Sequence, residues 1–541
     1  MAEFEKWDRY IGERQDHKEA EEDFLGVLDE SQRRQFQYSK DYDRILYSTA
    51  FRRLGGVAQV VTAGEVALFH NRLTHSLKTA QVGTRLANHL ARRYAARKDV
   101  LSDVDAFGGV DARVVRAACM AHDLGHPPFG HIAETELQRI LSYEKNKIYI
   151  ARAKGRKERV EANSVRSVVI PDGYRLADSF EGNAQSFRII TKLAFREYST
   201  RNNCSPALNL TKASLAATLK YPWSYEVRPP DAPDGMKWSY YNSESEIAEW
   251  ALTFGGERLR SRSCTPDDSD EPLFAFGTVE AQLMDWADDI SYAVHDAEDF
   301  FRAGLIPLHQ LRSGPEWDRF LEYAWPELVR AKKFKAGERE WADEQLGHVR
   351  RIFPSKAYEG FGSDREDLHK FASTTIVNAI RGTDILSEGI VAPSRKQRVI
   401  IEVLKRLTWY YVIDRPSLQS AQFGQRQMIR SLYRILIEWV EEAWLGLGSG
   451  RPSARSSEAD PADGLSAVDH RRPELPARLL SYLDIAMIEG SQRSDDNGDS
   501  AMISRAVVDY LVSLTEAQTI ELHARLTGDS ARSMLESWVQ L

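Results

Sequence analysis

The stretch from Cys119 to Glu134 constrains this chain more than any other part of it. It reads CMAHDLGHPPFGHIAE, and small apolar residues precede it. Glycines and prolines between the histidines force the backbone to turn sharply. The stretch therefore predicts a buried helix that ends at His122 and Asp123, a tight turn, and a second helix that starts near His131. Successive helical side chains diverge by roughly 100°, so an ion held by His122 and Asp123 needs ligands from elsewhere in the chain.

Two other segments offer such ligands. His75 lies near the start of a predicted helix in FHNRLTH (69–75), and Asp288 lies in a predicted helix over 278–302 that is otherwise apolar. A carboxylate on so apolar a helix needs a partner, because a buried unpaired charge is costly. The structural alternatives are an ordinary helix-start histidine and salt-bridged acids. Together with His122 and Asp123, the set of two imidazoles and two carboxylates suits Mn²⁺, Fe²⁺, Co²⁺, Ni²⁺, Mg²⁺ or Zn²⁺.

His131 and Glu134 stand three residues apart at the start of the second helix. A carboxylate that contacts an imidazole fixes its tautomer and raises its basicity, which suits general acid–base catalysis. Arg72, His126 and Lys220 are natural cations for phosphate groups. These residues predict a site for a phosphorylated substrate.

Composition excludes some classes of protein. The chain has 541 residues, 42% of them hydrophobic and 28% charged, with a net charge of −8 and three cysteines without metal-site spacing. The negative charge argues against a protein that mainly coats nucleic acid. A basic run over 144–168 suits either a phosphate-binding patch or a solvated insertion. No stretch reaches the ~18 apolar residues of a membrane span, and the first residues lack a signal-peptide core, so we expect a cytoplasmic protein.

Helical periodicity dominates the chain, which predicts an all-α fold with at most a short β-hairpin near 57–68. Segments 223–245 and 256–272 are rich in Pro, Asp, Ser and Gly and are expected to be loops. Amphipathic helices are expected through 300–445. Segment 446–477 is predicted to be a flexible loop, and helical periodicity resumes after it.

Several motifs together resemble one family. They are DRILYSTAFRRL (43–54), FHNRLTH (69–75), AHDLGHPPFGH (121–131), FEGNAQSFR (180–188), LNLTKASLAATLKYP (208–222), ADDISY (287–292) and RAVVDYLVSLTEAQ (505–518). The chain resembles the deoxynucleoside triphosphate triphosphohydrolases, the dGTPase family of the HD-domain phosphohydrolase superfamily. That resemblance implies one large helical unit over 1–541. Its HD catalytic core would span about 43–302, accessory helices 303–445, and C-terminal helices packed on the core 478–541.

The resemblance also implies a reaction. Enzymes of this family use a divalent metal ion to hydrolyse a dNTP, dGTP among them, into deoxynucleoside and inorganic triphosphate. His75, His122, Asp123 and Asp288 would hold the metal. His131 with Glu134 would act as the acid–base pair beside His126. The triphosphate would contact the following residues: Arg72, His126, Asn183, Lys220 and Tyr221.

The same resemblance places the sugar and base. Tyr292 would pack on the deoxyribose, Asp296 would contact the 3′-OH, and Arg53 and Leu54 would reach the sugar or the base edge. Many relatives have Gln after the Arg-Leu pair, where this chain has Gly55 and Gly56. The base preference of that loop is therefore not carried over.

Relatives are commonly homo-oligomers, often hexamers, and some take a dNTP effector. Two other readings stay open. One is a different HD-domain phosphohydrolase or phosphodiesterase acting on a nucleotide. The other is a regulator that binds single-stranded nucleic acid, which the basic run over 144–168 motivates.

Overall fold

The computed structural model describes residues 28–59, 69–95, 97, 104–142, 172–194, 207–227, 237–254, 257–259, 261–266, 273–331, 333–445, 475–491 and 498–529. The described chain is mostly helical, so the predicted fold class is confirmed.

The centre of the fold is the long helix α12 (Val279–Arg302). It packs against α4 (Arg72–Tyr94), α6 (Ala112–Ala121) and α10 (Lys212–Thr218), and α2 (Glu30–Leu46) covers α6. The side chain of Thr278 caps α12 by accepting a hydrogen bond from the Ala281 amide. Because α12 is buried on most of its faces, Asp296, Glu298 and Asp299 lie in the interior. Asp285, Asp288 and Asp289 keep part of their side-chain surface exposed.

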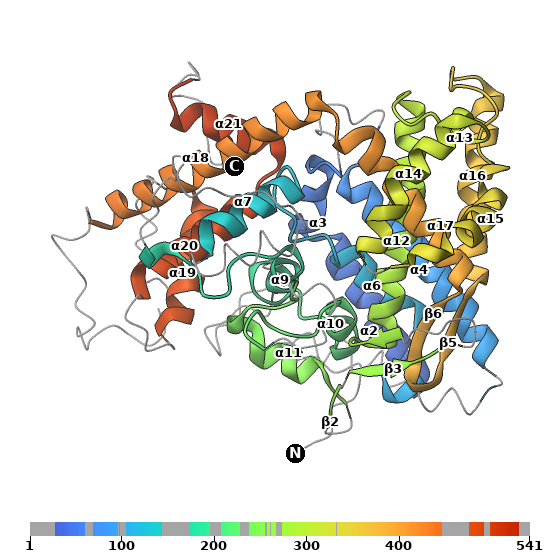
Figure 1. Ribbon diagram of the computed structural model, residues 1–541. Helices are drawn as coiled ribbons and strands as arrows, with labels where there is room; N and C mark the ends of the chain where they lie inside the picture. Colours follow the sequence, from blue (N-terminus) through green and yellow to red (C-terminus); the bar gives the residue numbers. More distant parts are fainter. Residues whose placement is uncertain are drawn as a thin grey trace.

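Two further groups of helices flank this centre (Figure 1). On one side α16 and α17 pack on α12, with α13, α14 and α15 beyond them. On the other side α18 packs against α7, α20 and α21, and α19 packs against α20. Their bounds are α7 (His131–Leu141), α13 (Leu308–Leu311), α14 (Pro315–Arg330), α15 (Arg339–Arg350), α16 (Gly362–Arg381), α17 (Arg395–Thr408), α18 (Pro416–Leu445), α19 (Ala477–Ser491), α20 (Gly498–Val512) and α21 (Glu516–Leu526).

Shorter helices connect these elements. The α-helices are α3 (Thr49–Arg53), α9 (Gly182–Arg188) and α11 (Ser245–Ala251). Single 3₁₀ or π turns are η1 (Leu54–Gly56), η3 (Asp172–Tyr174), η4 (Ile189–Leu193), η5 (Asn242–Glu244), η6 (Ala336–Glu338), η7 (Ser387–Gly389) and η8 (Trp409–Ile413).

Three small antiparallel sheets depart from the sequence expectation. They pair β1 (Thr253–Phe254) with β2 (Glu257–Arg258), β3 (Arg262–Cys264) with β4 (Leu273–Ala275), and β5 (Thr383–Leu386) with β6 (Ile390–Pro393). In the last pair Thr383 stands opposite Pro393. The prediction of a loop over 256–272 is wrong for β2 and β3. Strands of two to four residues carry no usable alternation, so their pairing depends on tertiary contacts.

Other expectations fall on residues outside the described part. Of the predicted hairpin near 57–68, Ala58 forms an isolated antiparallel bridge with Asn71, and 60–68 lie outside the described residues. The basic run 144–168 and most of the predicted loop 446–477 also lie outside them, and α19 begins at Ala477.

A buried ion network joins α9 to the C-terminal helices. Arg188 has no exposed side-chain surface, and its guanidinium contacts Glu244 at 2.8 Å, Glu489 at 3.0 Å and Asp509 at 2.9 Å. The amide of Gln185 donates to Asp509 at 2.7 Å. Breaking such a buried network leaves uncompensated charge, so α9 and α20 are firmly coupled.

Replacing Glu489 with glutamine should weaken folding in a pH-dependent way. Burial alone would raise the pKa of Glu489, but Arg188 and Lys192 overcome it and lower that pKa to about 2. The pair therefore stabilises the fold above the unfolded-state pKa of about 4.3, and this contribution is lost as pH falls toward 2. We expect E489Q to be less stable than wild type by on the order of 1–3 kcal/mol at pH 7.

Thermal unfolding at several pH values measures this effect. The difference in stability between wild type and E489Q should shrink between pH about 5 and 3, where the unfolded glutamate takes up its proton. A difference that stays constant down to pH 3 would contradict an ionised Glu489 in the network.

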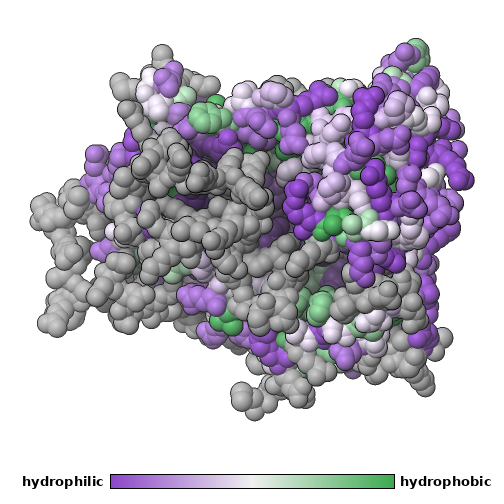
Figure 2. All heavy atoms as spheres, viewed as in Figure 1, coloured by the Kyte–Doolittle hydropathy of each residue, from purple (hydrophilic) through white to green (hydrophobic). Residues whose placement is uncertain are grey.

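None of the described helices is long and apolar enough to cross a membrane. On the face that Figure 2 shows, the described residues are mostly hydrophilic and the hydrophobic areas are small.

Candidate functional site

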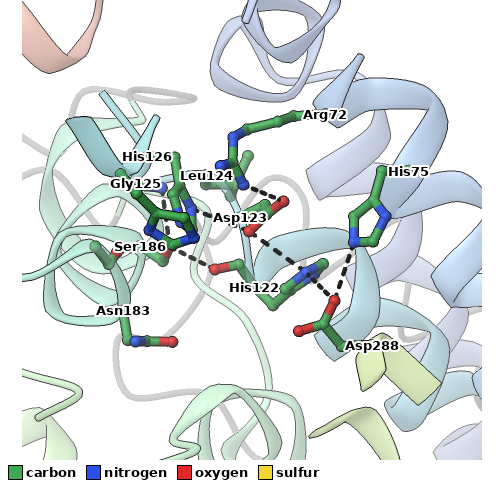
Figure 3. Close-up of polar contacts among 12 residues, drawn as sticks. Arg72, His75, His122, Asp123, Leu124, Gly125, His126, Asn183, Ser186 and Asp288 are labelled. Atoms are coloured by element: carbon green, nitrogen blue, oxygen red, sulfur yellow. Dashed lines mark hydrogen bonds and ion pairs between the residues drawn. The ribbon is translucent and has the colours of Figure 1, made fainter. Parts of the chain in front are cut away.

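Four side chains from three helices converge at the centre of the fold (Figure 3). His75 lies in the first turn of α4, whose N-cap Asn71 forms a capping box with Thr74. His122 is the C-cap of α6, and Asp123 follows it. Asp288 projects from the middle of α12. These are the four residues that the sequence predicts as metal ligands.

The distances among them are short. His75 Nε2 lies 3.0 Å from Asp288 Oδ1. His122 Nε2 lies 3.5 Å from the same oxygen and 3.4 Å from Asp123 Oδ1. The other ring nitrogen of His122, Nδ1, donates to the carbonyl of Cys119 at 2.6 Å. That bond fixes the tautomer and turns the lone pair of Nε2 toward the two carboxylates.

This arrangement fits a divalent metal ion. Ligand atoms at 2.0–2.2 Å from one ion lie about 3 Å apart, which matches the spacing of the set. His122 Nε2 is buried and has no hydrogen-bond partner among the described residues. Although burial opposes a charge on His122, Asp123 and Asp288 raise its pKa to about 9. The carboxylates thus create a field that favours positive charge where the four side chains meet, and an ion can replace that proton.

Arg72 and His126 contact the same carboxylate. Arg72 is 2% exposed, and its Nη1 donates to Asp123 Oδ2 at 2.8 Å. His126 Nδ1 lies 3.0 Å from Asp123 Oδ1. Burial, reinforced by Arg72, lowers the pKa of His126 to about 4. The imidazole is therefore neutral at pH 7, so it can offer a hydrogen bond but not the positive charge that the sequence suggested.

His131 and Glu134 form the second part of the site. His131 Nδ1 donates to Glu134 Oε2 at 2.8 Å, and Glu134 Oε1 accepts from the Gly182 amide at 3.1 Å. The side chain of His131 is 68% exposed, whereas that of Glu134 is 11% exposed. His126 lies between the two parts, since its ring packs edge-on against His131 with centroids 5.2 Å apart.

Of the residues predicted to bind a triphosphate, Asn183 lies in α9, and Lys220 and Tyr221 lie just after α10. Asn183 donates its side-chain amide to Glu181 Oε1 at 2.8 Å. The ammonium of Lys220 forms an ion pair with Asp285 on α12. The half-buried ring of Tyr221 packs on Trp223 with centroids 5.7 Å apart.

Sequence reasoning missed one cation here. The pKa of Lys237 is raised above its usual value. The largest cause is the charge of Tyr221, and Glu181 and Glu134 add to it. Lys237 lies in a segment that the sequence predicts only as loop, and no local pattern identifies it. The aromatic residues that follow this lysine in MKWSYY were the one available hint.

Asp288, Tyr292 and Asp296 follow one another at four-residue intervals on α12, as predicted. Asp296 is 4% exposed, and its Oδ2 has no hydrogen-bond partner among the described residues. Burial, with Asp299 nearby, raises the pKa of Asp296 well above its usual value. Tyr292 and Asp296 therefore place polar side chains about one and two helical turns after Asp288 on α12.

Arg53 and Leu54 are buried beside the turn that follows Asp123. Leu54 has no exposed surface. Arg53 Nη2 donates to the carbonyls of Leu124 and His126, each at 2.8 Å, and Nη1 donates to that of Leu514 at 3.0 Å. The Arg53 guanidinium thus donates to backbone carbonyls in this structure, and its contact with sugar or base stays a prediction.

The turn after Asp123 packs tightly against α9. The Gly125 amide donates to Ser186 Oγ at 2.8 Å, and this hydroxyl donates to the His122 carbonyl at 2.8 Å. A Cβ at Gly125 would lie 2.2 Å from the Gly182 oxygen and 2.2 Å from the Ser186 nitrogen. Only glycine allows this approach.

Replacing Gly125 with alanine should therefore destabilise the fold by about 3 kcal/mol or more, since two backbone segments must separate. Gly347→Ala is the matched control, because a Cβ there meets nothing within 4 Å and α15 should gain helix propensity. Thermal unfolding measures both. A G125A protein as stable as G347A would contradict the packing.

Comparison with known proteins agrees with this geometry. The HD domain family model matches residues 72–169, which include His75, His122 and Asp123. The chain is an HD-domain protein. This HD-domain protein is also 29% identical over 509 residues to the deoxyguanosinetriphosphate triphosphohydrolase-like protein of Streptomyces coelicolor, covering 91% of this chain and 92% of that one.

Proteins with the same name in two other bacteria are similar. The one from Shewanella oneidensis is 28% identical and covers 76% of this chain and 88% of its own. The one from Shewanella baltica strain OS195 is 27% identical and covers 73% of this chain and 80% of its own. The HD-domain protein is thus homologous over most of its length to such proteins, and it is an HD-domain phosphohydrolase with a candidate His/Asp metal site.

Proposed function

We propose that this protein uses a divalent metal ion to hydrolyse deoxynucleoside triphosphates, dGTP among them, to deoxynucleoside and inorganic triphosphate. One observation carries the proposal: a His/Asp set that fits a metal ion stands beside an exposed imidazole paired with a buried carboxylate. The names of the relatives in Streptomyces and Shewanella support the substrate class.

His75, His122, Asp123 and Asp288 would hold the metal ion, which supplies Lewis-acid polarisation of a phosphate oxygen when bound. Arg72 neutralises Asp123 from behind and fixes the orientation of its carboxylate. The Cys119 carbonyl fixes the orientation of the His122 ring by accepting a hydrogen bond from it. Asp123 and His122 are thereby preorganised before substrate arrives.

His131 and Glu134 would transfer the proton. Glu134 accepts from His131 Nδ1, which leaves Nε2 as the atom that exchanges a proton with the reacting group. In a dNTP that group lies at the α-phosphorus and the 5′ oxygen, and cleavage there releases the three phosphates together. The exposure of His131 lets a substrate reach it, while the burial of Glu134 keeps the carboxylate in place.

Cations around α9 and α10 would bind the triphosphate chain. Lys220 and Lys237 supply charge, Asn183 and Tyr221 supply hydrogen bonds, and His126 supplies a neutral imidazole. On α12, Asp296 would accept from a sugar hydroxyl, because its Oδ2 is otherwise unsatisfied. Tyr292 would pack against the deoxyribose.

Product analysis tests the proposal. Purified protein is incubated with each dNTP, alone and mixed, with Mn²⁺ or Mg²⁺. Release of triphosphate and deoxynucleoside is expected. Pyrophosphate or a monophosphate would instead indicate another HD-domain phosphohydrolase chemistry. No turnover, with salt-dependent binding of single-stranded DNA that survives His122→Ala, would indicate a nucleic-acid-binding regulator.

We also propose that the chain forms a homo-oligomer, such as a hexamer. Members of the dGTPase family, which the chain resembles, are commonly oligomers. Light scattering on the purified chain measures its mass in solution. A monomer at micromolar concentration would overturn this part.

A further inference from the structure

We propose that the C-terminal segment Leu514–Glu516 is a positioning element of the active site. Through Arg53 and Glu516 it holds the turn over 124–131, which joins the predicted metal ligands to the acid–base pair. The test of this proposal by enzyme turnover rests on the proposed function. The contacts themselves do not.

The first contact set holds the carbonyl side of the turn. Arg53 lies at the end of α3, and its Nη2 bridges the carbonyls of Leu124 and His126 at 2.8 Å each. Its Nη1 donates to the carbonyl of Leu514 at 3.0 Å. One buried guanidinium therefore joins the start of the turn to the C-terminal segment, and all three carbonyl contacts are charge-assisted.

The second contact set holds the amide side of the turn. Glu516 is 3% exposed, and its Oε1 accepts from the Phe129 amide at 3.2 Å and from the Ala58 amide at 3.0 Å. Phe129 has φ 67° and Gly130 has φ 55°, so two consecutive residues are left-handed. That conformation costs free energy at Phe129, and it persists only where the surroundings impose it. A buried carboxylate on the Phe129 amide does this directly before α7 begins.

A third contact shows how closely the two segments approach. A Cβ at Gly56 would lie 2.7 Å from Thr515 Cγ2. The two segments 53–58 and 514–516 thus meet along Arg53, Gly56 and Ala58, with a residue of the C-terminal segment at each point. We call this contact region the C-terminal seam.

The seam acts on one half of the site more than on the other. His131 follows Gly130 directly, so the path of the turn sets where its imidazole stands. His75 and Asp288 are held instead by α4 and α12, and the His122 carbonyl by Ser186. Loosening the turn should therefore displace the acid–base pair and spare the metal ligands. A misplacement of about 1 Å can cost on the order of 100-fold in rate.

Variants of Glu516 test the role. Glu516→Ala removes the acceptor, and Glu516→Asp keeps the charge but withdraws the carboxylate by one methylene. Both should lower kcat by about 10- to 100-fold with KM and bound metal near wild type. Glu516→Gln should retain most activity, because its amide oxygen can still accept both bonds. Glu521→Ala is the control, since Glu521 lies on the same helix and pairs with Arg525.

Hydrogen exchange gives a readout that does not depend on the reaction. In Glu516→Ala the peptide containing Phe129 should exchange faster than in wild type, while peptides from α4 and α12 should not change. Slow exchange at Phe129 in a folded Glu516→Ala protein would overturn the inference, as would unchanged kcat, or loss of metal together with activity. Faster exchange in a protein that does not cleave dNTPs would overturn only the proposed function.

Discussion

Replacing Asp288 with alanine should abolish both metal binding and turnover. Asp288 Oδ1 lies within 3.5 Å of the Nε2 atoms of both His75 and His122, so it occupies the point where the imidazoles converge. Although burial opposes its charge, the two histidines hold the pKa of Asp288 well below its usual value, and the carboxylate is ionised. Without it, two imidazoles and Asp123 must hold an ion with half of the negative charge removed.

Metal content after loading with Mn²⁺ and desalting, together with kcat on dGTP, measures this effect. Asp289→Ala is the control, because Asp289 is the next residue on α12 but pairs with Lys405 at 2.7 Å. It should keep its metal. Asp288→Asn should bind the ion weakly, since the shape remains and the charge is lost. Stoichiometric metal and normal turnover in Asp288→Ala would remove Asp288 from the site.

The parts of this site that sequence could predict are those with a local signal. The run His122-Asp123-Leu-Gly125 shows its helix end and its turn through residue types alone, and the structure places α6 and α7 as predicted. The long helix α12 was predictable because Thr278 caps it and its apolar residues cover several faces. Carboxylates on such a helix were expected to need partners, and Asp288 has them in His75 and His122.

Other parts depend on segments far apart in the chain. Arg53 was expected near the sugar or base. In the structure its guanidinium donates hydrogen bonds to the carbonyls of Leu124, His126 and Leu514. Its carbonyl partner Leu514 lies 461 residues away, so no local pattern could reveal it. Glu516 escaped notice for the same reason. The small sheets did too, because strands as short as β1 and β2 exist only where neighbouring loops meet.

The charge on His126 marks a different limit. Its residue type suggests a cation, but protonation depends on burial and on the distance to Arg72, which are properties of the fold. Sequence supplies the groups that can titrate, and the structure decides which of them are charged.

Replacing His131 with alanine should leave the metal in place and lower kcat by roughly two to four orders of magnitude, the usual scale of a lost acid–base group. His131 contacts Glu134 and packs on His126, and neither of these residues is one of the four predicted metal ligands. Metal content and kcat on dGTP are the measurements. His369→Ala, on the exposed side of α16, should match wild type in both.

The two variants separate the halves of the site, because each removes a different property. Asp288→Ala loses the ion and with it the rate, whereas His131→Ala loses rate at full metal occupancy. If His131→Ala also lost its metal, the acid–base pair and the metal ligands would form a single cluster, and the second His/Glu group would be a coordination site. If it kept both metal and rate, the proton would have to move through another group, and His126, whose ring packs on His131, would be the next residue to replace.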